Sequence, residues 1–221
     1  MTAATRTPLV PSPLRRPLML TVLVAAAVFA FLAVRYAGTS TAGHVDNKVD
    51  SVVDPLGDAH QWLVDHAMMF GSPPWVVAMA LVLSMLCLLL RRYRLAILAL
   101  VGPGLTGLTT TVLKPALDRT IDGGYAFPSG HTGGATSLGL VAGLLLISLL
   151  QPGRVGALVI LAVAAVGVGG GVGAAMVASD AHYPTDTLGG FCTAVVMVGG
   201  AALALDWLAT VRGPSNLRTK S

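Results

Sequence analysis

The sequence predicts an all-α integral membrane protein, a bundle of six transmembrane helices. Hydrophobic residues make up 54% of the chain and charged residues only 11%, whereas soluble domains contain about 45–50% apolar and about 25% charged residues. The apolar residues form six long runs, and no run contains Asp, Lys, Arg or His. Because roughly 20 predominantly apolar residues cross a hydrocarbon core about 30 Å thick, each run has the length of a membrane span.

Polar segments separate the six runs. A charge at the centre of a bilayer costs about 2.5–3.5 kcal/mol, so a spanning helix is expected to lack charges in the way these runs do. The runs, in chain order, are Leu18–Val34, Pro73–Leu90, Leu95–Leu113, Thr132–Leu150, Val155–Ser179 and Thr187–Leu205.

The first run has a second interpretation, as a cleaved signal peptide, because Arg15 and Arg16 precede it. The apolar part of a signal peptide is usually about 7–15 residues long and ends at a small-residue cleavage site. This run is longer and no convincing cleavage site follows it, so we favour a retained helix.

The expected domain organisation follows from the runs. We expect, in order, an N-terminal tail (1–17), a first transmembrane helix (18–37), an extramembrane loop (38–72), a membrane core (73–208) and a C-terminal tail (209–221).

The basic residues predict the orientation in the cell membrane. Ten of the 14 Lys and Arg residues flank the runs on one side, and an excess of Lys and Arg marks the cytoplasmic side. Both termini of this multi-pass protein are therefore predicted to be cytoplasmic. All five His and nine of the ten Asp residues then lie on the extracytoplasmic side, where we expect any chemistry to occur. The basic residues form no continuous face, which argues against nucleic-acid binding.

The loop 38–72 contains four Asp residues at a four-residue spacing, which places their carboxylates on one helical face. We expect a short helix at the membrane interface with these carboxylates in water. The spacing of a calcium-binding loop is missing. The four residues are Asp46, Asp50, Asp54 and Asp58, and His44, His60 and His66 are expected at the surface as well.

A candidate anion site follows the third run. Lys114 and Arg119 stand at the end of a predicted membrane helix, and Ser129 and Gly130 form a turn that leads directly into the next one. The free N–H groups at a helix N-terminus bind anions, and the two cations make the site suitable for phosphate. Either cation alone is more simply explained as an interfacial anchor.

A candidate nucleophile precedes the last run. His182 and Asp186 are four residues apart, so on a helix the carboxylate can reach one imidazole nitrogen and leave the other free to attack. A single His at a helix end, such as His131 or His182, is more often a cap than a catalyst. The hypothesis depends on the combination of these groups on one side of the membrane.

The segment from Phe127 to His131, Phe-Pro-Ser-Gly-His, followed by His182-x-x-x-Asp186, resembles the type 2 phosphatidic acid phosphatase family, which shares its core with vanadium haloperoxidases. The resemblance covers about residues 75–208. It implies that His182 attacks phosphorus and forms a phosphohistidine, that Asp186 orients His182, and that His131 protonates the leaving group. The implied phosphate ligands are Lys114, Ser129 and Gly130.

The sequence departs from the family pattern at two positions. Ile121 and Met176 stand where the family has arginines, and we expect Arg119 to replace the missing arginine of the first motif as a phosphate ligand. Loss of one donor to a transition state commonly costs about 10²–10³ in rate. The alternative to an enzyme is therefore a degenerate lipid-phosphate-binding or scaffold protein of the same fold.

The predicted function is a metal-independent phosphatase that hydrolyses a lipid phosphomonoester or diphosphate at the extracytoplasmic face. Prenyl phosphates, phosphatidate and phosphatidylglycerol phosphate are the candidate substrates. No cofactor is expected, because no residues have the spacing of zinc or magnesium ligands. A haloperoxidase is disfavoured by the six spans, and an ion-coupled transporter by their lack of charge. The oligomeric state does not follow from the sequence.

Overall fold

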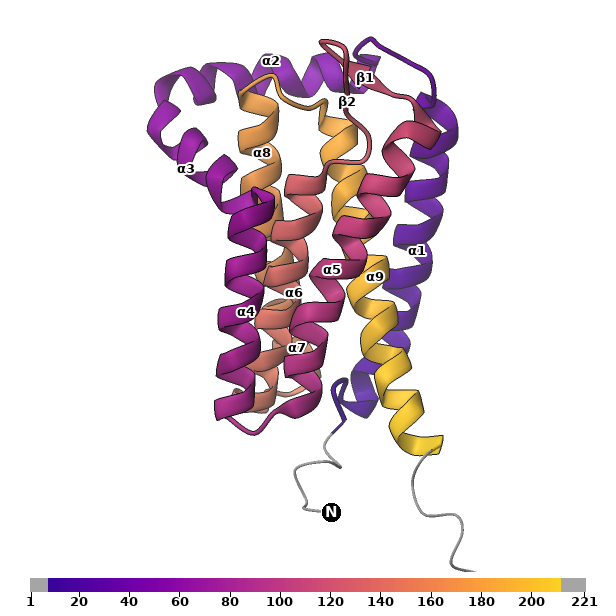
Figure 1. The fold of residues 1–221 in the computed structure, drawn as a ribbon, viewed down its shortest axis with the longest axis vertical. Helices are drawn as coiled ribbons and strands as arrows, with labels where there is room; N and C mark the ends of the chain where they lie inside the picture. The colour runs from indigo at the N-terminus through magenta and orange to yellow at the C-terminus, as the bar shows by residue number, and fades with distance from the viewer. Residues whose placement is uncertain (1–7, 212–221) are drawn as a thin grey trace, which may run out of the picture.

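The structure is a computed structural model that describes residues 8–211, apart from the side chains of residues 54 and 56–58. The described chain is all-α except for one short hairpin (Figure 1). Its elements are α1 (Ser12–Tyr36), α2 (His44–Ala59), α3 (Gln61–Gly71), α4 (Pro73–Leu89), α5 (Tyr93–Leu117), β1 (Thr120–Ile121), β2 (Gly124–Tyr125), α6 (Gly130–Leu150), α7 (Arg154–Ala164), a π-helical segment (Ala165–Gly170), α8 (Gly171–Ala178) and α9 (Pro184–Val211).

The predicted six-span membrane bundle is confirmed. Within residues 8–211, five helices are long and apolar enough to cross a membrane, with α7, the π-helical segment and α8 forming one of them. The α3–α4 pair, bent by 65°, raises the number to six. Each predicted run coincides with one of these spans, because burial in lipid requires the same uncharged length that the runs show.

The π-helical segment is a feature that the apolar pattern did not predict. It lies in the fifth span beside α6, and a Cβ atom at Gly169 would overlap the Thr136 side chain. A side chain at this position would therefore push the two helices apart. Helix packing in membranes favours small residues at such close contacts.

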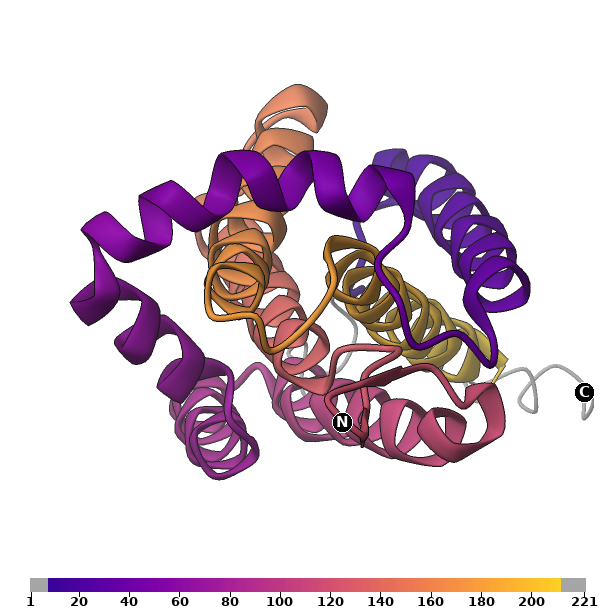
Figure 2. The same cartoon turned by 90° about the horizontal axis from the view of Figure 1, so that it is seen from above.

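The central helix of the bundle is α6. In the most apolar part of each span, 67% of α6 is buried inside the protein, whereas only 17% of α1 is buried. In Figure 1 the helix α6 is surrounded by α4, α5, α7 and α9. The helix α1 packs along α9. Figure 2 shows α2 and α3 as an arc across one end of the bundle, with α2 passing above the end of α8.

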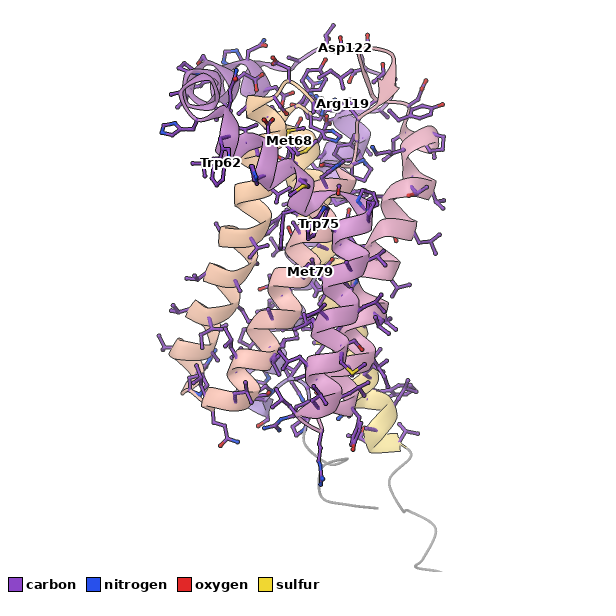
Figure 3. The ribbon with its side chains drawn as sticks, turned by 60° about the vertical axis from the view of Figure 1, so that its left-hand side comes forward. Trp62, Met68, Trp75, Met79, Arg119 and Asp122 are labelled. Atoms are coloured by element: carbon purple, nitrogen blue, oxygen red, sulfur yellow. The ribbon has the colours of Figure 1, made fainter. Side chains whose placement is uncertain are left out.

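The two ends of the bundle differ in their side chains. Trp62 and Trp75, both exposed, lie towards the end that carries α2 and the hairpin (Figure 3), where aromatic rings are typical of a membrane interface. At the opposite end the buried Asp206 pairs with Arg94 at 2.6 Å and accepts hydrogen bonds from the backbone of Leu9 and Val10. This carboxylate fastens the start of the described chain to α9.

The orientation predicted from the arginines is testable by thiol labelling. Asn47 on α2 and Arg154 at the start of α7 are both exposed, at opposite ends of the bundle. We expect Asn47→Cys to react with a membrane-impermeant maleimide in intact cells, and Arg154→Cys only after permeabilisation. The wild-type chain is the control, because Cys87 and Cys192 are buried. The reverse pattern would place α2 in the cytoplasm.

Candidate active site

The predicted site residues gather at the end of the bundle that α2 covers. The N-terminus of α6 is fixed by Ser129, whose hydroxyl oxygen accepts hydrogen bonds from the N–H and the hydroxyl of Thr132. The Ser129 N–H donates to the Asp186 carbonyl oxygen at 3.0 Å. This bond joins the turn before α6 to the first turn of α9, so the two motifs that are far apart in the sequence meet.

A glycine allows this meeting. A Cβ atom on Gly190 of α9 would overlap the Ser129 carbonyl oxygen. Any larger residue at position 190 would therefore separate α9 from the N-terminus of α6. The segment that contains His131 is thereby held next to the segment that contains His182.

The predicted His182–Asp186 pair is present and buried. The His182 Nδ1 atom lies 3.7 Å from Asp186 Oδ2, the His182 side chain is 7% exposed, and the Asp186 side chain is fully buried. This distance exceeds that of a hydrogen bond, and His182 Nδ1 has no hydrogen-bond partner among the described residues. Such catalytic contacts often tighten only when substrate binds. Because Nδ1 faces the carboxylate, Nε2 is the nitrogen left for chemistry.

Lys114 and His131 stand at one end of a groove with a volume of about 620 Å³ between α4, α5 and α6. The Lys114 Nζ atom donates a hydrogen bond to the Tyr125 carbonyl oxygen at 3.0 Å, so the hairpin holds this cation in place. Away from these groups the groove is lined by apolar side chains such as Val76 and Leu100. One end of the groove therefore carries titratable side chains, and the rest of its lining is largely apolar.

Arg119 does not have the role that we expected. Its side chain is fully buried, with Nη1 2.6 Å from Asp186 Oδ1 and Nη2 2.8 Å from Asp46 Oδ2. Nη1 also donates to the Thr185 hydroxyl. Both terminal nitrogens already serve protein carboxylates, which argues against the predicted role of Arg119 as a phosphate ligand.

Two aromatic rings enclose the same guanidinium. Its Cζ atom lies 4.2 Å from the centre of the Tyr36 ring and 4.6 Å from that of Tyr183, which are cation–π distances. Burial raises the pKa of the Tyr183 phenol, and the nearby Arg119 opposes this shift. The Tyr183 ring therefore stays neutral near pH 7. In Figure 3, Arg119 lies deeper in the molecule than Asp122.

The Asp46 carboxylate was also expected to lie in water, and in the structure it does not. It is fully buried, and besides the bond to Arg119 it accepts hydrogen bonds from the N–H groups of Thr185 and Gly43. One member of the predicted solvated face of α2 thus points into the site. His44, His60 and His66 are exposed, as expected.

Tyr36, Asp46 and Tyr183 are the site components that sequence reasoning missed. Tyr183 follows His182 directly, so its position next to the motif was the available signal. Tyr36 follows shortly after the first apolar run, and Asp46 is one of four Asp residues at a four-residue spacing. Neither pattern distinguishes a buried contact from a surface residue.

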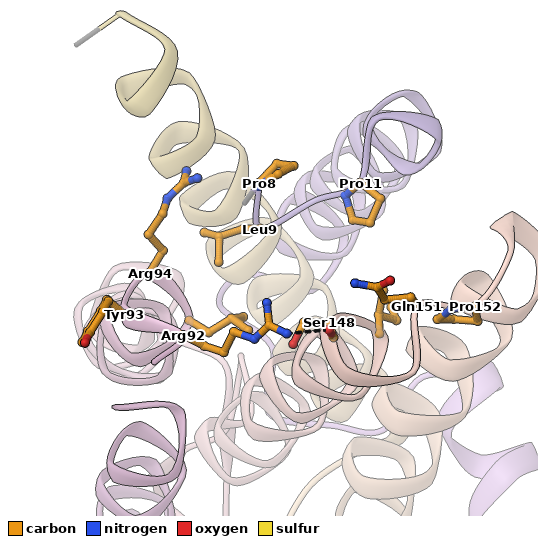
Figure 4. Close-up of a pocket in the computed structure, with 11 residues that line it drawn as sticks. Pro8, Leu9, Pro11, Arg92, Tyr93, Arg94, Ser148, Gln151 and Pro152 are labelled. Carbon is orange, nitrogen blue, oxygen red and sulfur yellow. Dashed lines mark hydrogen bonds between the residues drawn. The ribbon is translucent and has the colours of Figure 1, made fainter. Parts of the chain in front are cut away.

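A second pocket, of about 290 Å³, lies at the opposite end of the bundle (Figure 4). Arg92 and Arg94 line it together with Tyr93 and Gln151, and Arg92 donates a hydrogen bond to the Ser148 carbonyl oxygen. Its described lining contains no His or Asp and none of the predicted site residues. We therefore take the groove that Lys114, Gly130 and His131 line as the candidate active site. Within the described residues, no group of three or more His, Cys, Asp or Glu is arranged to hold a metal ion.

Comparisons with known proteins agree with this geometry. The chain has the same fold as a crystal structure of a transmembrane PAP2-type phosphatidylglycerolphosphate phosphatase from Bacillus subtilis, with a TM-score of 0.63 and 18% sequence identity. The match covers 90% of this chain and 99% of that one. A search of curated proteins finds no significant match. The PAP2 superfamily matches residues 95–209, more than half of the chain, and so this multi-pass membrane protein belongs to the PAP2 superfamily.

Proposed function

We propose that this protein is a phosphatase that hydrolyses a lipid phosphomonoester at the extracytoplasmic face of the membrane. The observation that carries the proposal is the buried His182–Asp186 pair, which the hydrogen bond from the Ser129 N–H to the Asp186 carbonyl oxygen joins to the start of α6. There His131 and Lys114 line one end of a groove whose other walls are largely apolar. A phosphate group suits the charged end and an acyl or prenyl chain suits the apolar part. Phosphate release from a lipid phosphate by the purified protein tests the proposal, and no release from any candidate substrate would contradict it.

The proposed chemistry has two steps. In the first, His182 Nε2 attacks phosphorus, the bond from phosphorus to the lipid oxygen breaks, and His131 gives a proton to that oxygen. In the second, water attacks the phosphohistidine, His131 accepts a proton from this water, and inorganic phosphate leaves. Asp186 stabilises the positive charge on the imidazole of His182. Lys114, together with the Gly130 N–H at the start of α6, holds the phosphate. Ser129, whose own N–H is donated to Asp186, fixes the turn instead of binding the phosphate directly.

The charges around the groove favour a monoester over a diphosphate. Lys114 is the only Lys or Arg among the described residues that line the groove, and Arg119 is neutralised by Asp46 and Asp186. Moving an anion out of water is costly unless cations or hydrogen-bond donors replace the water. A diphosphate carries more negative charge than a monophosphate, and Lys114 can neutralise only one unit of it.

The rival function is a lipid-phosphate-binding or scaffold protein without turnover. The observation in its favour is the same shortage of cations, since Ile121 and Met176 replace the arginines of the family pattern and Arg119 is not free to compensate. Binding of vanadate or a lipid phosphate by the wild-type protein, with no phosphate release, would favour this function.

Replacing each histidine by alanine, and assaying substrates with a poor and a good leaving group, separates the roles of the two histidines. His182→Ala is expected to abolish turnover of every substrate, because the nucleophile is needed whatever leaves. His131→Ala is expected to lose about 10²–10⁴-fold on an alkyl phosphate but much less on p-nitrophenyl phosphate, whose leaving group needs no proton. The measurement is kcat/KM on both substrates.

The exposed His66 supplies the matched control, and His66→Ala should retain wild-type rates on both substrates. Equal losses on the two substrates for His131→Ala would show that His131 binds phosphate rather than donating a proton.

Substrate charge provides a second test. We expect a prenyl monophosphate to have a higher kcat/KM than the diphosphate of the same chain length. Ile121→Arg restores a cation at a half-buried position of β1 where the family has one, and it should move this preference towards the diphosphate. A wild-type preference for the diphosphate would contradict the charge argument.

Metal independence is a third expectation. The carboxylates of Asp46 and Asp186 are occupied by Arg119, and all the groups assigned to the phosphate are protein cations or backbone N–H groups. Activity should therefore persist in EDTA, and vanadate should inhibit as a phosphate analogue. Loss of activity in EDTA with recovery on addition of Mg²⁺ would overturn this expectation.

A further inference from the structure

We propose that Asp46, acting through Arg119, is a positioning residue for the His182–Asp186 pair. Asp46 belongs to α2 and lies outside the segment that matches the PAP2 superfamily, residues 95–209. The helix that crosses the outer end of the bundle would thus be part of the active site rather than a surface appendage. This inference rests on the proposed function and names a group that orients the nucleophile without touching the substrate.

The two oxygens of Asp186 have separate partners. Oδ1 accepts a hydrogen bond from Arg119 Nη1 at 2.6 Å. Oδ2 accepts one from the Tyr183 N–H at 3.1 Å and faces His182 Nδ1 at 3.7 Å. Because Arg119 holds Oδ1, the carboxylate keeps one rotation, in which Oδ2 is turned towards the imidazole.

Asp46 prevents Arg119 from turning fully towards Asp186. A guanidinium readily binds both oxygens of one carboxylate at once, and such a pair would draw Oδ2 away from His182. In this structure Arg119 Nη2 is instead bound by Asp46 Oδ2 at 2.8 Å. The sharing of one guanidinium by two carboxylates therefore keeps Asp186 Oδ2 available for His182.

Asp46 is itself held rigidly. Its Oδ1 accepts a hydrogen bond from the Thr185 N–H at 3.0 Å, next to Asp186 at the start of α9. Its Oδ2 accepts one from the Gly43 N–H at 2.9 Å, before the first turn of α2. The rings of Tyr36 and Tyr183 also lie over Arg119. These contacts give Asp46 one position relative to α9, which a positioning role requires.

The test is Asp46→Asn, which keeps the size of the side chain and removes its charge. Arg119 then keeps Asp186 as its only described carboxylate partner. We expect kcat per folded molecule to fall about 10- to 100-fold, as for other groups that orient a catalytic residue, while KM changes little because the phosphate ligands are untouched. Folded protein is counted as the monodisperse fraction in size-exclusion chromatography in detergent. Asp65→Asn, the same change at an exposed site on α3, is the matched control.

A second readout is independent of turnover. The ring ¹⁵N signals of His182, assigned by their absence in His182→Ala, report how closely Nδ1 approaches the Asp186 carboxylate. These signals should shift in Asp46→Asn and stay unchanged in Asp65→Asn. If the wild-type protein releases no phosphate, the proposed function fails, while the His182 signals still decide the role of Asp46.

Unchanged kcat and unchanged His182 signals in folded Asp46→Asn would overturn the assignment. A fall in activity that merely follows the loss of monodisperse protein, with unchanged His182 signals, would also overturn it. If Asp46→Asn does not fold, Tyr36→Leu replaces it, because it removes one ring from Arg119 and keeps an apolar side chain. That variant should lower kcat several-fold and shift the His182 signals, and the absence of both effects would refute the proposal.

Discussion

The interactions of the buried Arg119 guanidinium hold together the end of the bundle that α2 covers. The guanidinium joins Asp46 of α2 to Asp186 of α9 and lies between the rings of Tyr36 and Tyr183. Removal of one partner from a buried ion pair costs about 3–5 kcal/mol, because the remaining charge is left without compensation. The segments that meet at Arg119 are therefore held in one arrangement, in which the first turn of α9, with Asp186, is hydrogen-bonded to the turn before α6.

The membrane imposes the second constraint. Spans without charge confine the titratable side chains to the two ends of the bundle, where water and head groups can solvate them. A reaction that needs imidazole, carboxylate and ammonium groups is then expected at one end, at the level where a lipid carries its phosphate. The groove between α4, α5 and α6 runs from that end along apolar side chains of the bundle. The proposed position of the site and the proposed class of substrate thus follow from the same constraint.

The spans and the motif residues were predictable from the sequence, because charge-free length and the spacing of His182 and Asp186 are local properties. The roles of Asp46 and Arg119 were not. Asp46 shares its four-residue spacing with Asp50, and only the docking of α2 against α9 makes one of them a buried partner. Arg119 was assigned to phosphate from its distance along the chain to Lys114, which contains no information about a carboxylate on a different helix.

The enclosure of Arg119 changes how the shortage of cations in the groove should be understood. A cation that binds the phosphate equally well in the ground state and in the transition state lowers KM without raising kcat. A group that stabilises a charge formed only during the attack raises kcat, because it stabilises the transition state alone. In the proposed mechanism the imidazole of His182 gains positive charge as it attacks, and Asp186 stabilises that charge. On the same proposal Arg119 supports the nucleophile, and Lys114 is left to hold the phosphate. We therefore expect substrate affinity to come largely from the apolar groove, where a lipid chain would supply the binding energy that the missing arginines do not.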